Sequence, residues 1–505
     1  MDTILLFAIA IVPIVWLITA LGFLKLPAMH ACLGALAGTA VLSLLVWKMP
    51  ALTMLSAVFE GIALALWPIM LVIIAAIFAY NLSIHTKSME TIKKMLSGIS
   101  SDRRIQVLIL AWGFGGFLEA VAGYGTAVAI PAGILAALGF QPVFAAVICL
   151  IANTVPTAFG AVGIPVTTLA KVTGLDVMPL SYTIGLQLLL FIVIIPFALV
   201  IITTKSFKGL KGVVGITLAS GVAFAVPQML AAKYLGAELP ALLGSICSMG
   251  VTILLAKYFY KDKQNSAPSG ISLKQGVIAW IPYILVFVFI ILTSPLFPAV
   301  SEFLGQVKTS VVLYLGEGAS PSVFKWIATP GTLMILAAVL GGLIQGARLK
   351  EIVKVFGKTL KQLWRSTVTV MSIVAMAKVM GYSGMITSIA VVLVKVTGAY
   401  FPFIAPAIGS LGTFLTGSDT SSNVLFGSLQ VEVAKSTGVD PYWLAAANTS
   451  GATAGKMISP QSIAVATSAT GLVGSEGKIF IQSLKFCLGY VVVLGVLVLV
   501  GSWFI

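Results

Sequence analysis

Two carboxylates and one lysine stand in polar or glycine-rich stretches of an otherwise apolar sequence. Glu119 lies in GFGGFLEAVAGYGT, Asp419 in GTFLTGSDTSSN and Lys456 in NTSGATAGKMISP. A lysine among Ser, Thr and Asn donors suits a small anion, and a carboxylate in apolar surroundings can carry a proton. These residues predict a site in which Lys456 binds a substrate carboxylate while Asp419 or Glu119 carries the coupling proton.

The structural alternative is a buried ion pair or a helix cap that only fixes the backbone at these stretches. A charge at the centre of a bilayer costs about 3 kcal/mol, so such charges usually have a function. Two further groups are possible members of the site. Lys378 lies inside an apolar segment, although it could instead reach the membrane interface. His30 opens the second apolar segment and could titrate, although it could also serve in packing.

The chain that must position these groups is apolar from end to end. Of its 505 residues, 59% are hydrophobic and only 9% are charged, and the mean hydropathy is +1.10. Soluble proteins carry about 25% charged residues. Apolar stretches of about 20 residues, enough to cross a bilayer as a helix, recur along the whole length. The first, from Ile4 to about Leu24, lacks a basic start and a cleavage site, so we expect it to be retained.

The polar stretches interrupt these apolar segments in pairs. Those around Glu119 and Asp419 each separate two short apolar arms and predict re-entrant hairpins at about 105–140 and 402–436. The stretches that begin at Asn153 and Asn448 each split a span and predict broken helices at about 142–173 and 441–470.

Such interruptions can form a binding site. They expose backbone N–H groups at half-helix N-termini, which favour a carboxylate. Irregular backbone is tolerated inside a membrane only where it is buried or lines a cavity. Besides Lys456, the residues expected to bind substrate are Gly123, Tyr124, Gly125, Thr126, Asn153, Thr154, Ser418, Thr420, Ser421, Asn423, Asn448 and Thr449.

Weak internal similarity divides the chain into two halves. Val58-Phe59 and Leu66-Trp67 recur 297 positions later, and Asn153-Thr154 recurs 295 positions later. Repeats of this kind are typical of secondary transporters. The predicted parts are a first repeat at 1–205, two linking spans with a cytoplasmic loop at 206–275, and a second repeat at 276–505.

The distribution of charge predicts that the two repeats have inverted topology. Lys and Arg collect in cytoplasmic loops, and each basic loop in one half corresponds to a nearly uncharged loop in the other. The basic loops lie near Lys87–Arg104, Lys205–Lys211, Lys257–Lys274 and Arg348–Arg365. The net charge of +15 therefore reflects membrane orientation, and nucleic acid is not expected as a partner. The predicted fold class is an all-α polytopic membrane protein of two inverted repeats, each with a re-entrant hairpin and a broken transmembrane helix.

Three long motifs resemble the lactate permease family. They are GFLEAVAGYGTAVAIP (116–131), GSDTSSNVLFGSLQ (417–430) and NTSGATAGKMISPQSIAVA (448–466), and the family's length and span pattern fit nearly the whole chain. The resemblance implies a multi-pass transporter of the bacterial inner membrane that imports lactate, glycolate or other small 2-hydroxy monocarboxylates by proton symport. It also implies kinship with a wider ion-transporter superfamily, and through it alternating access and a homodimer.

Other functions stay open at this point. A sodium-coupled carboxylate transporter or antiporter of the same fold is the main alternative, because oxygens at the hairpin tips could hold sodium. An enzyme would need a nucleophile with a base or a metal cluster, but neither of the two histidines lies in a break. A channel would not need the paired breaks. No GxxxxGK[ST] motif is present, and no cofactor or metal is expected.

Overall fold

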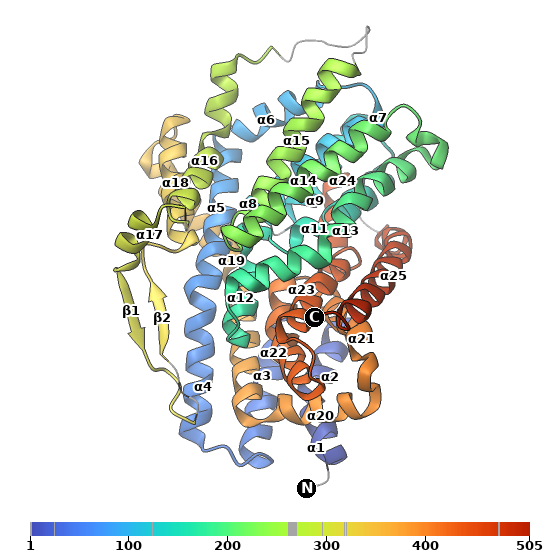
Figure 1. Cartoon of the computed structure of the whole chain (residues 1–505). Coiled ribbons are helices and arrows are strands. Elements are labelled where there is room, and N and C mark those ends of the chain that lie inside the picture. Colours follow the sequence, from blue (N-terminus) through green and yellow to red (C-terminus); the bar gives the residue numbers. More distant parts are fainter. Residues whose placement is uncertain are drawn as a thin grey trace.

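The computed structural model describes residues 3–24, 26–123, 125–260, 270–294, 296–317, 319, 321–472 and 475–505. Within these residues the chain is a bundle of helices with one small two-stranded sheet at its edge (Figure 1). Eleven of the described helices are long and apolar enough to cross a membrane. The predicted all-α polytopic membrane class is therefore confirmed.

Two 35-residue helical spans cross the molecule next to each other. One consists of α4 (Ala51–Leu64), the π-helical η2 (Ala65–Met70) and α5 (Leu71–His85), and the other is α19 (Leu349–Ser383). The first span is interrupted at Trp67, where the backbone is extended (φ −132°, ψ 115°). α19 is continuous and about 52 Å long at 1.5 Å per residue, so it exceeds a hydrocarbon layer of about 30 Å. They approach closely at Gly61, where a Cβ would collide with the backbone of Ala375.

Two helical hairpins are closed by glycines with positive φ. In the first, α7 (Arg103–Val107), the π-helical η3 (Leu108–Phe114) and α8 (Gly115–Val121) lead to a turn before α9 (Thr126–Ala137). This turn holds Gly123 at φ 59° and Gly125 at φ 84°. In the second hairpin, Gly417 at φ 71° separates α21 (Phe401–Thr416) from α22 (Asp419–Thr437). Glycine suits these positions because other L-residues rarely adopt a left-handed backbone.

Two further spans are interrupted part-way along. α10 (Pro142–Ala152) and the short α11 (Thr154–Thr157) precede α12 (Gly160–Thr173), which has left-handed backbone from Ala161 to Gly163. α23 (Pro441–Lys456) is separated from α24 (Pro460–Thr470) by three residues. Pro460 fits the first turn of α24 because that turn needs no amide hydrogen from it.

The other elements surround these parts. They are α1 (Thr3–Ala10), α2 (Val12–Ile18), the π-helical η1 (Thr19–Phe23), α3 (Ala28–Leu45), α6 (Ser88–Ser97), α13 (Val177–Thr204), η4 (Phe207–Leu210), α14 (Val214–Tyr234), α15 (Pro240–Phe259), α16 (Leu273–Leu292), α17 (Pro298–Gly305), α18 (Pro330–Ile344), α20 (Met385–Thr397), η5 (Gly398–Tyr400) and α25 (Glu476–Gly501). The sheet pairs β1 (Lys308–Val311) with β2 (Ser322–Lys325) in antiparallel register, with Lys308 opposite Lys325.

Basic segments that are distant in sequence meet on one face of the molecule. Thr86 Oγ1 donates to Gln345 Oε1 at 2.7 Å, which joins the end of α5 to the segment before α19. Arg104 Nη1 donates to the carbonyl oxygens of Gly209 at 2.8 Å and Lys211 at 3.1 Å. These contacts bring three of the four predicted basic loops together, at the top of Figure 1. The fourth lies partly outside the described residues. This grouping predicts a cytoplasmic face, while the inverted relation of the two halves stays a prediction.

The second hairpin packs on α23 through glycines. A Cβ on Gly409 would collide with the carbonyl oxygen of Asn448, and one on Gly451 would collide with that of Pro406. A Cβ on Gly455 would meet the carbonyl oxygen of Ser410 in the same way. Without side chains at these positions, the two helices can touch backbone to backbone, as small residues allow in membranes.

We expect Gly451→Ala to destabilise the protein by about 1–3 kcal/mol, because the new methyl group overpacks a rigid backbone contact. Thermal unfolding of the detergent-solubilised chain would show a lower Tm. Gly489→Ala in α25 is the control, because a Cβ there meets no atom of the described residues within 4 Å. That variant should be neutral or slightly stabilised. Equal Tm values for the two variants would contradict the backbone contact.

Candidate functional site

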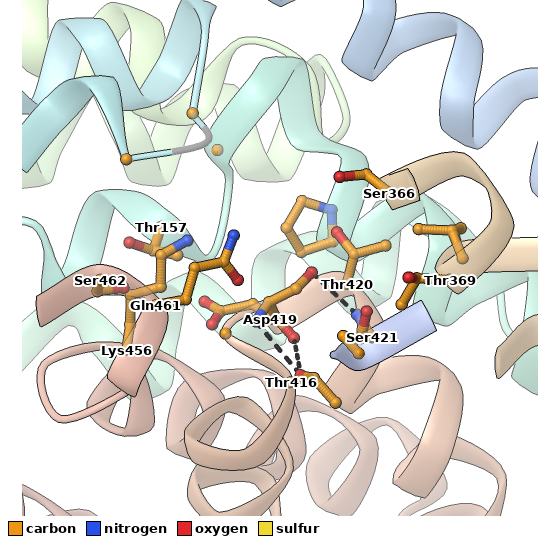
Figure 2. A pocket seen from close by; sticks show the side chains of 18 of the residues that line it. Thr157, Ser366, Thr369, Thr416, Asp419, Thr420, Ser421, Lys456, Gln461 and Ser462 are labelled. Atoms are coloured by element: carbon orange, nitrogen blue, oxygen red, sulfur yellow. Dashed lines mark hydrogen bonds between the residues drawn. The ribbon is translucent and has the colours of Figure 1, made fainter. Parts of the chain in front are cut away.

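A cavity of about 630 Å³ lies where the hairpin turns meet the interrupted spans (Figure 2). Its volume is in the range of small-molecule sites. The predicted site residues in its wall are Glu119, Gly123, Gly125, Ser418, Asp419, Thr420, Ser421 and Lys456. The two halves of the chain therefore contribute to one cavity.

Two carboxylates and one ammonium group share this wall. Lys456 Nζ lies 3.8 Å from Glu119 Oε1, which is close enough for an ion pair but long for a hydrogen bond. Asp419 Oδ1 accepts a hydrogen bond from Thr413 Oγ1 at 3.1 Å. All three charged residues are buried, with 2% exposure for Glu119, 2% for Asp419 and 8% for Lys456. The charges thus sit in a site from which most water is excluded.

Each carboxylate has one oxygen available for another group. Glu119 Oε2 and Asp419 Oδ2 are buried and have no hydrogen-bond partner among the described residues. Buried polar atoms are nearly always paired in folded proteins, so an unpaired oxygen at a cavity marks a place for a ligand, a water molecule or a proton. Both atoms belong to residues that line the cavity.

Gly160 makes room for the carboxylate of Glu119. A Cβ on Gly160 would lie 2.7 Å from Glu119 Oε1, closer than real Cβ atoms approach. Gly160 begins α12, which also contributes Ala161 and Ile164 to the cavity wall. A side chain at position 160, at the start of α12, would therefore require the Glu119 carboxylate to shift.

The structure adds polar cavity residues that the sequence reasoning missed. They are Thr157, Ser366, Thr369, Thr416, Gln461 and Ser462 (Figure 2). Gln461 and Ser462 follow Pro460 directly, so the break in that span could have identified them as cavity residues from the sequence. Ser366 and Thr369 lie inside α19 without a local break, and Thr369 Oγ1 donates to the Arg365 carbonyl oxygen at 2.9 Å. No signal in the sequence distinguished this pair from other helical hydroxyls.

Three predicted binding residues form a buried network behind the cavity. Asn423 Oδ1 accepts from Asn448 Nδ2 at 2.9 Å and from Thr449 Oγ1 at 3.0 Å. Asn423 Nδ2 donates to the Pro165 carbonyl oxygen at 3.0 Å. Asn423, Asn448 and Thr449 are fully buried and are not in the cavity wall. They join α22 to α12 and α23 and so position the elements that carry the charges.

Three other predicted residues also lie outside the wall. Thr126 Oγ1 donates to the Gly123 carbonyl oxygen at 2.8 Å, and Thr154 Oγ1 to that of Ile151 at 2.8 Å. Asn153 is buried, and its amide atoms have no hydrogen-bond partner in the described structure. Tyr124 lies outside the described residues.

Lys378 and His30 are not brought to the cavity. Lys378 Nζ donates to Glu60 Oε1 at 3.0 Å, and Tyr382 OH donates to Glu60 Oε2 at 2.8 Å. This ion pair joins α19 to α4, away from the wall residue Thr369. His30 is exposed near the start of α3. The structure thus places both outside the lining, and Lys378 already has its partner.

The chain matches the model of the L-lactate permease family over residues 6–504. The L-lactate permease of Streptococcus iniae is 54% identical over 440 residues, which cover 87% of this chain and 93% of that protein. The L-lactate permease of Bacillus subtilis (strain 168) is 37% identical, over 95% of this chain and 92% of that protein. The glycolate permease GlcA of Escherichia coli (strain K12) is 36% identical, with coverages of 98% and 95%.

Two solved structures are similar at a lower level. The YdaH transporter of Alcanivorax borkumensis has a TM-score of 0.45 and 12% identity, over 84% of each chain. MtrF of Neisseria gonorrhoeae has a TM-score of 0.45 and 14% identity, over 88% of this chain and 83% of that one.

The family match covers nearly the whole sequence and agrees with the eleven apolar helices that can cross a membrane. The expected location as a multi-pass protein of the bacterial plasma membrane is confirmed, as is the resemblance carried by the three sequence motifs. The chain belongs to the L-lactate permease family.

Proposed function

We propose that this chain imports lactate, glycolate and related small 2-hydroxy monocarboxylates by proton symport with alternating access. The observation that carries the proposal is one buried lysine and two buried carboxylates in the wall of a single cavity. The names of the relatives, L-lactate permease and glycolate permease, support the substrate class.

Four helices begin at the cavity, which favours an anion there. α9 follows Gly125, the regular part of α12 begins at Ile164 after the left-handed Gly163, α22 follows Ser418 and α24 starts at Pro460. Gly125, Ile164, Ser418 and Pro460 all line the wall. Helix N-termini present free N–H groups and the positive end of the helix dipole. Together with Lys456, they supply the positive potential that a carboxylate needs. Thr420, Ser421 and Gln461 offer hydrogen-bond partners for the C2 hydroxyl group.

The balance of charge supports a proton as the coupling ion. With both carboxylates ionised and Lys456 protonated, these three groups carry one net negative charge. Lactate alone would add a second, which is costly in a cavity of low dielectric. Lactate and one proton together leave the net charge unchanged. Anion binding then favours protonation of Asp419 or Glu119, and protonation favours anion binding by the same factor.

The wall comes from two groups of helices, which supports alternating access. Hairpins and interrupted spans contribute the charged side, whereas Ile73 of α5 and Ser366, Thr369 and Val370 of α19 contribute the other. A movement of one group against the other would change the side to which the cavity opens. Three further features stay predictions of the alternating-access model. They are the inverted relation of the two repeats, the re-entrant course of the hairpins and a homodimer.

Proton coupling should require one of the two carboxylates. In proteoliposomes, we expect an inward pH gradient to accelerate radiolabelled lactate uptake, with or without sodium, and an uncoupler to abolish the effect. Asp419→Asn or Glu119→Gln should remove gradient-driven accumulation but retain lactate exchange, because a neutral amide cannot release a proton. Uptake that requires sodium would refute proton coupling. Gradient-driven accumulation retained in both variants would refute the role of the two carboxylates as proton carriers.

Anion binding should require the charge of Lys456. We expect Lys456→Met to weaken lactate binding by about 10- to 100-fold, the range for a hydrogen bond to a charged group. The affinity for lactate would be measured from the protection that lactate gives the purified protein against thermal unfolding. Lys395→Met, at an exposed position of α20, is the matched control and should bind normally. Equal affinity in the two variants would exclude Lys456 from the anion site.

A further inference from the structure

The first half of α19 carries three distinct faces. Successive residues of a helix are rotated by about 100°, so each face can be assigned from the sequence and from exposure. The buried face holds Ile352, Val355, Thr359 and Leu363. The exposed apolar face holds Leu349, Val353, Leu360 and Trp364. The exposed basic face holds Lys350, Lys354, Lys358, Lys361 and Arg365.

The exposed faces are narrow and adjoin each other. At about 100° per residue, the apolar face spans about 60° of the helix circumference and the basic face about 80°. All five exposed cations thus lie beside one apolar stripe.

The buried face holds this helix firmly on α5. Asn81 Nδ2 donates to Thr359 Oγ1 at 2.9 Å and to Gln362 Oε1 at 3.1 Å. The rings of Phe78 and Phe356 meet edge to face, with centroids 5.1 Å apart. Because α5 anchors one side of the helix, the other two faces point outward in a fixed direction.

The basic face has no ion-pair partner within the part of the chain that the structure describes. None of the five basic residues takes part in a salt bridge there. The carboxylate of Glu351, at the edge of this face, accepts a hydrogen bond from the Arg348 amide at 2.9 Å and lies 3.9 Å from His85 Nε2. The five cations are therefore available to an external anionic partner.

We propose that the exposed faces of this half of α19 bind anionic phospholipids of the cytoplasmic leaflet. The apolar face would lie against the acyl chains, while the basic face would meet the headgroups, as in interfacial amphipathic helices. The length of α19 is consistent with a position at the lipid headgroups, because the helix exceeds the hydrocarbon layer by about 20 Å. The charged end also lies on the face where the other basic segments gather.

Charge complementarity selects this partner over the other possibilities. A zwitterionic lipid would cover the apolar face but would bring no net negative charge to the five cations. A second copy paired through the apolar stripe about a two-fold axis would cover that stripe but supply no counter-charge to the cations, because it carries the same positive face. A free phosphate would use the basic face only and leave the apolar stripe uncovered.

The test compares lipid preference in phosphatidylcholine vesicles that contain the full-length protein. Spin-labelled phosphatidylglycerol and spin-labelled phosphatidylcholine report which lipid is immobilised at the protein surface. We expect the protein to prefer phosphatidylglycerol. In the variant Lys354→Gln/Lys358→Gln/Lys361→Gln, the preference for phosphatidylglycerol should fall by at least about fivefold. A change of about fivefold is what a single lysine contributes near an anionic surface. High salt should weaken the preference of the unmodified protein.

Two controls make the result specific. Lys205→Gln/Lys208→Gln/Lys211→Gln removes the same charge from another exposed basic segment and should keep the preference. Lys354→Arg/Lys358→Arg/Lys361→Arg keeps the charge on α19 and should also keep it. The proposal is overturned if both glutamine variants lose the preference equally, or if neither loses it. It is also overturned if soluble glycerol phosphate abolishes the preference, because the site would then bind a free phosphate.

Discussion

Helix ends inside a membrane leave backbone N–H and C=O groups without partners, and lipid cannot satisfy them. The central architecture of this chain meets that constraint by bringing its interrupted helices together. Asn423 receives hydrogen bonds from Asn448 and Thr449 and donates to the carbonyl oxygen of Pro165. One amide thus links the second hairpin to both interrupted spans. The helix starts at Gly125, Ser418 and Pro460 line the cavity, where their polarity is available to a substrate.

Close packing makes the same arrangement compatible with buried charge. The glycines on α21 and α23 allow backbone contact between these helices. Gly160 plays a related part at the cavity, because a side chain at this position would require the carboxylate of Glu119 to shift. Lys456 lies 3.8 Å from Glu119 and shares the cavity wall with Asp419. With both carboxylates ionised and Lys456 protonated, the three groups carry one net negative charge, and they then favour an anion that arrives with a proton. This is the physical basis of the proposed coupling.

The spans and the broken segments could be predicted because they depend on local properties of the chain. A Gly-Ser-Asp-Thr-Ser-Ser-Asn run from Gly417 to Asn423 cannot be exposed to lipid, so its burial at a site follows from composition alone. The same local reasoning singled out Glu119, Asp419 and Lys456. It could not separate cavity residues from supporting residues, because Ser421 and Asn423 belong to the same polar run. The turn of α22 decides that Ser421 lines the cavity and Asn423 does not.

The sequence by itself determined that this chain spans a membrane and which family it resembles, since hydropathy and motifs are properties of short stretches of residues. Only the tertiary structure decided which groups meet. Lys378 looked similar to Lys456 as a charge in an apolar segment, yet its ammonium pairs with Glu60, 318 positions away. Ser366 and Thr369 entered the wall through the packing of α19. Such contacts depend on the orientation of whole helices, and that orientation is set by side chains far apart in the sequence.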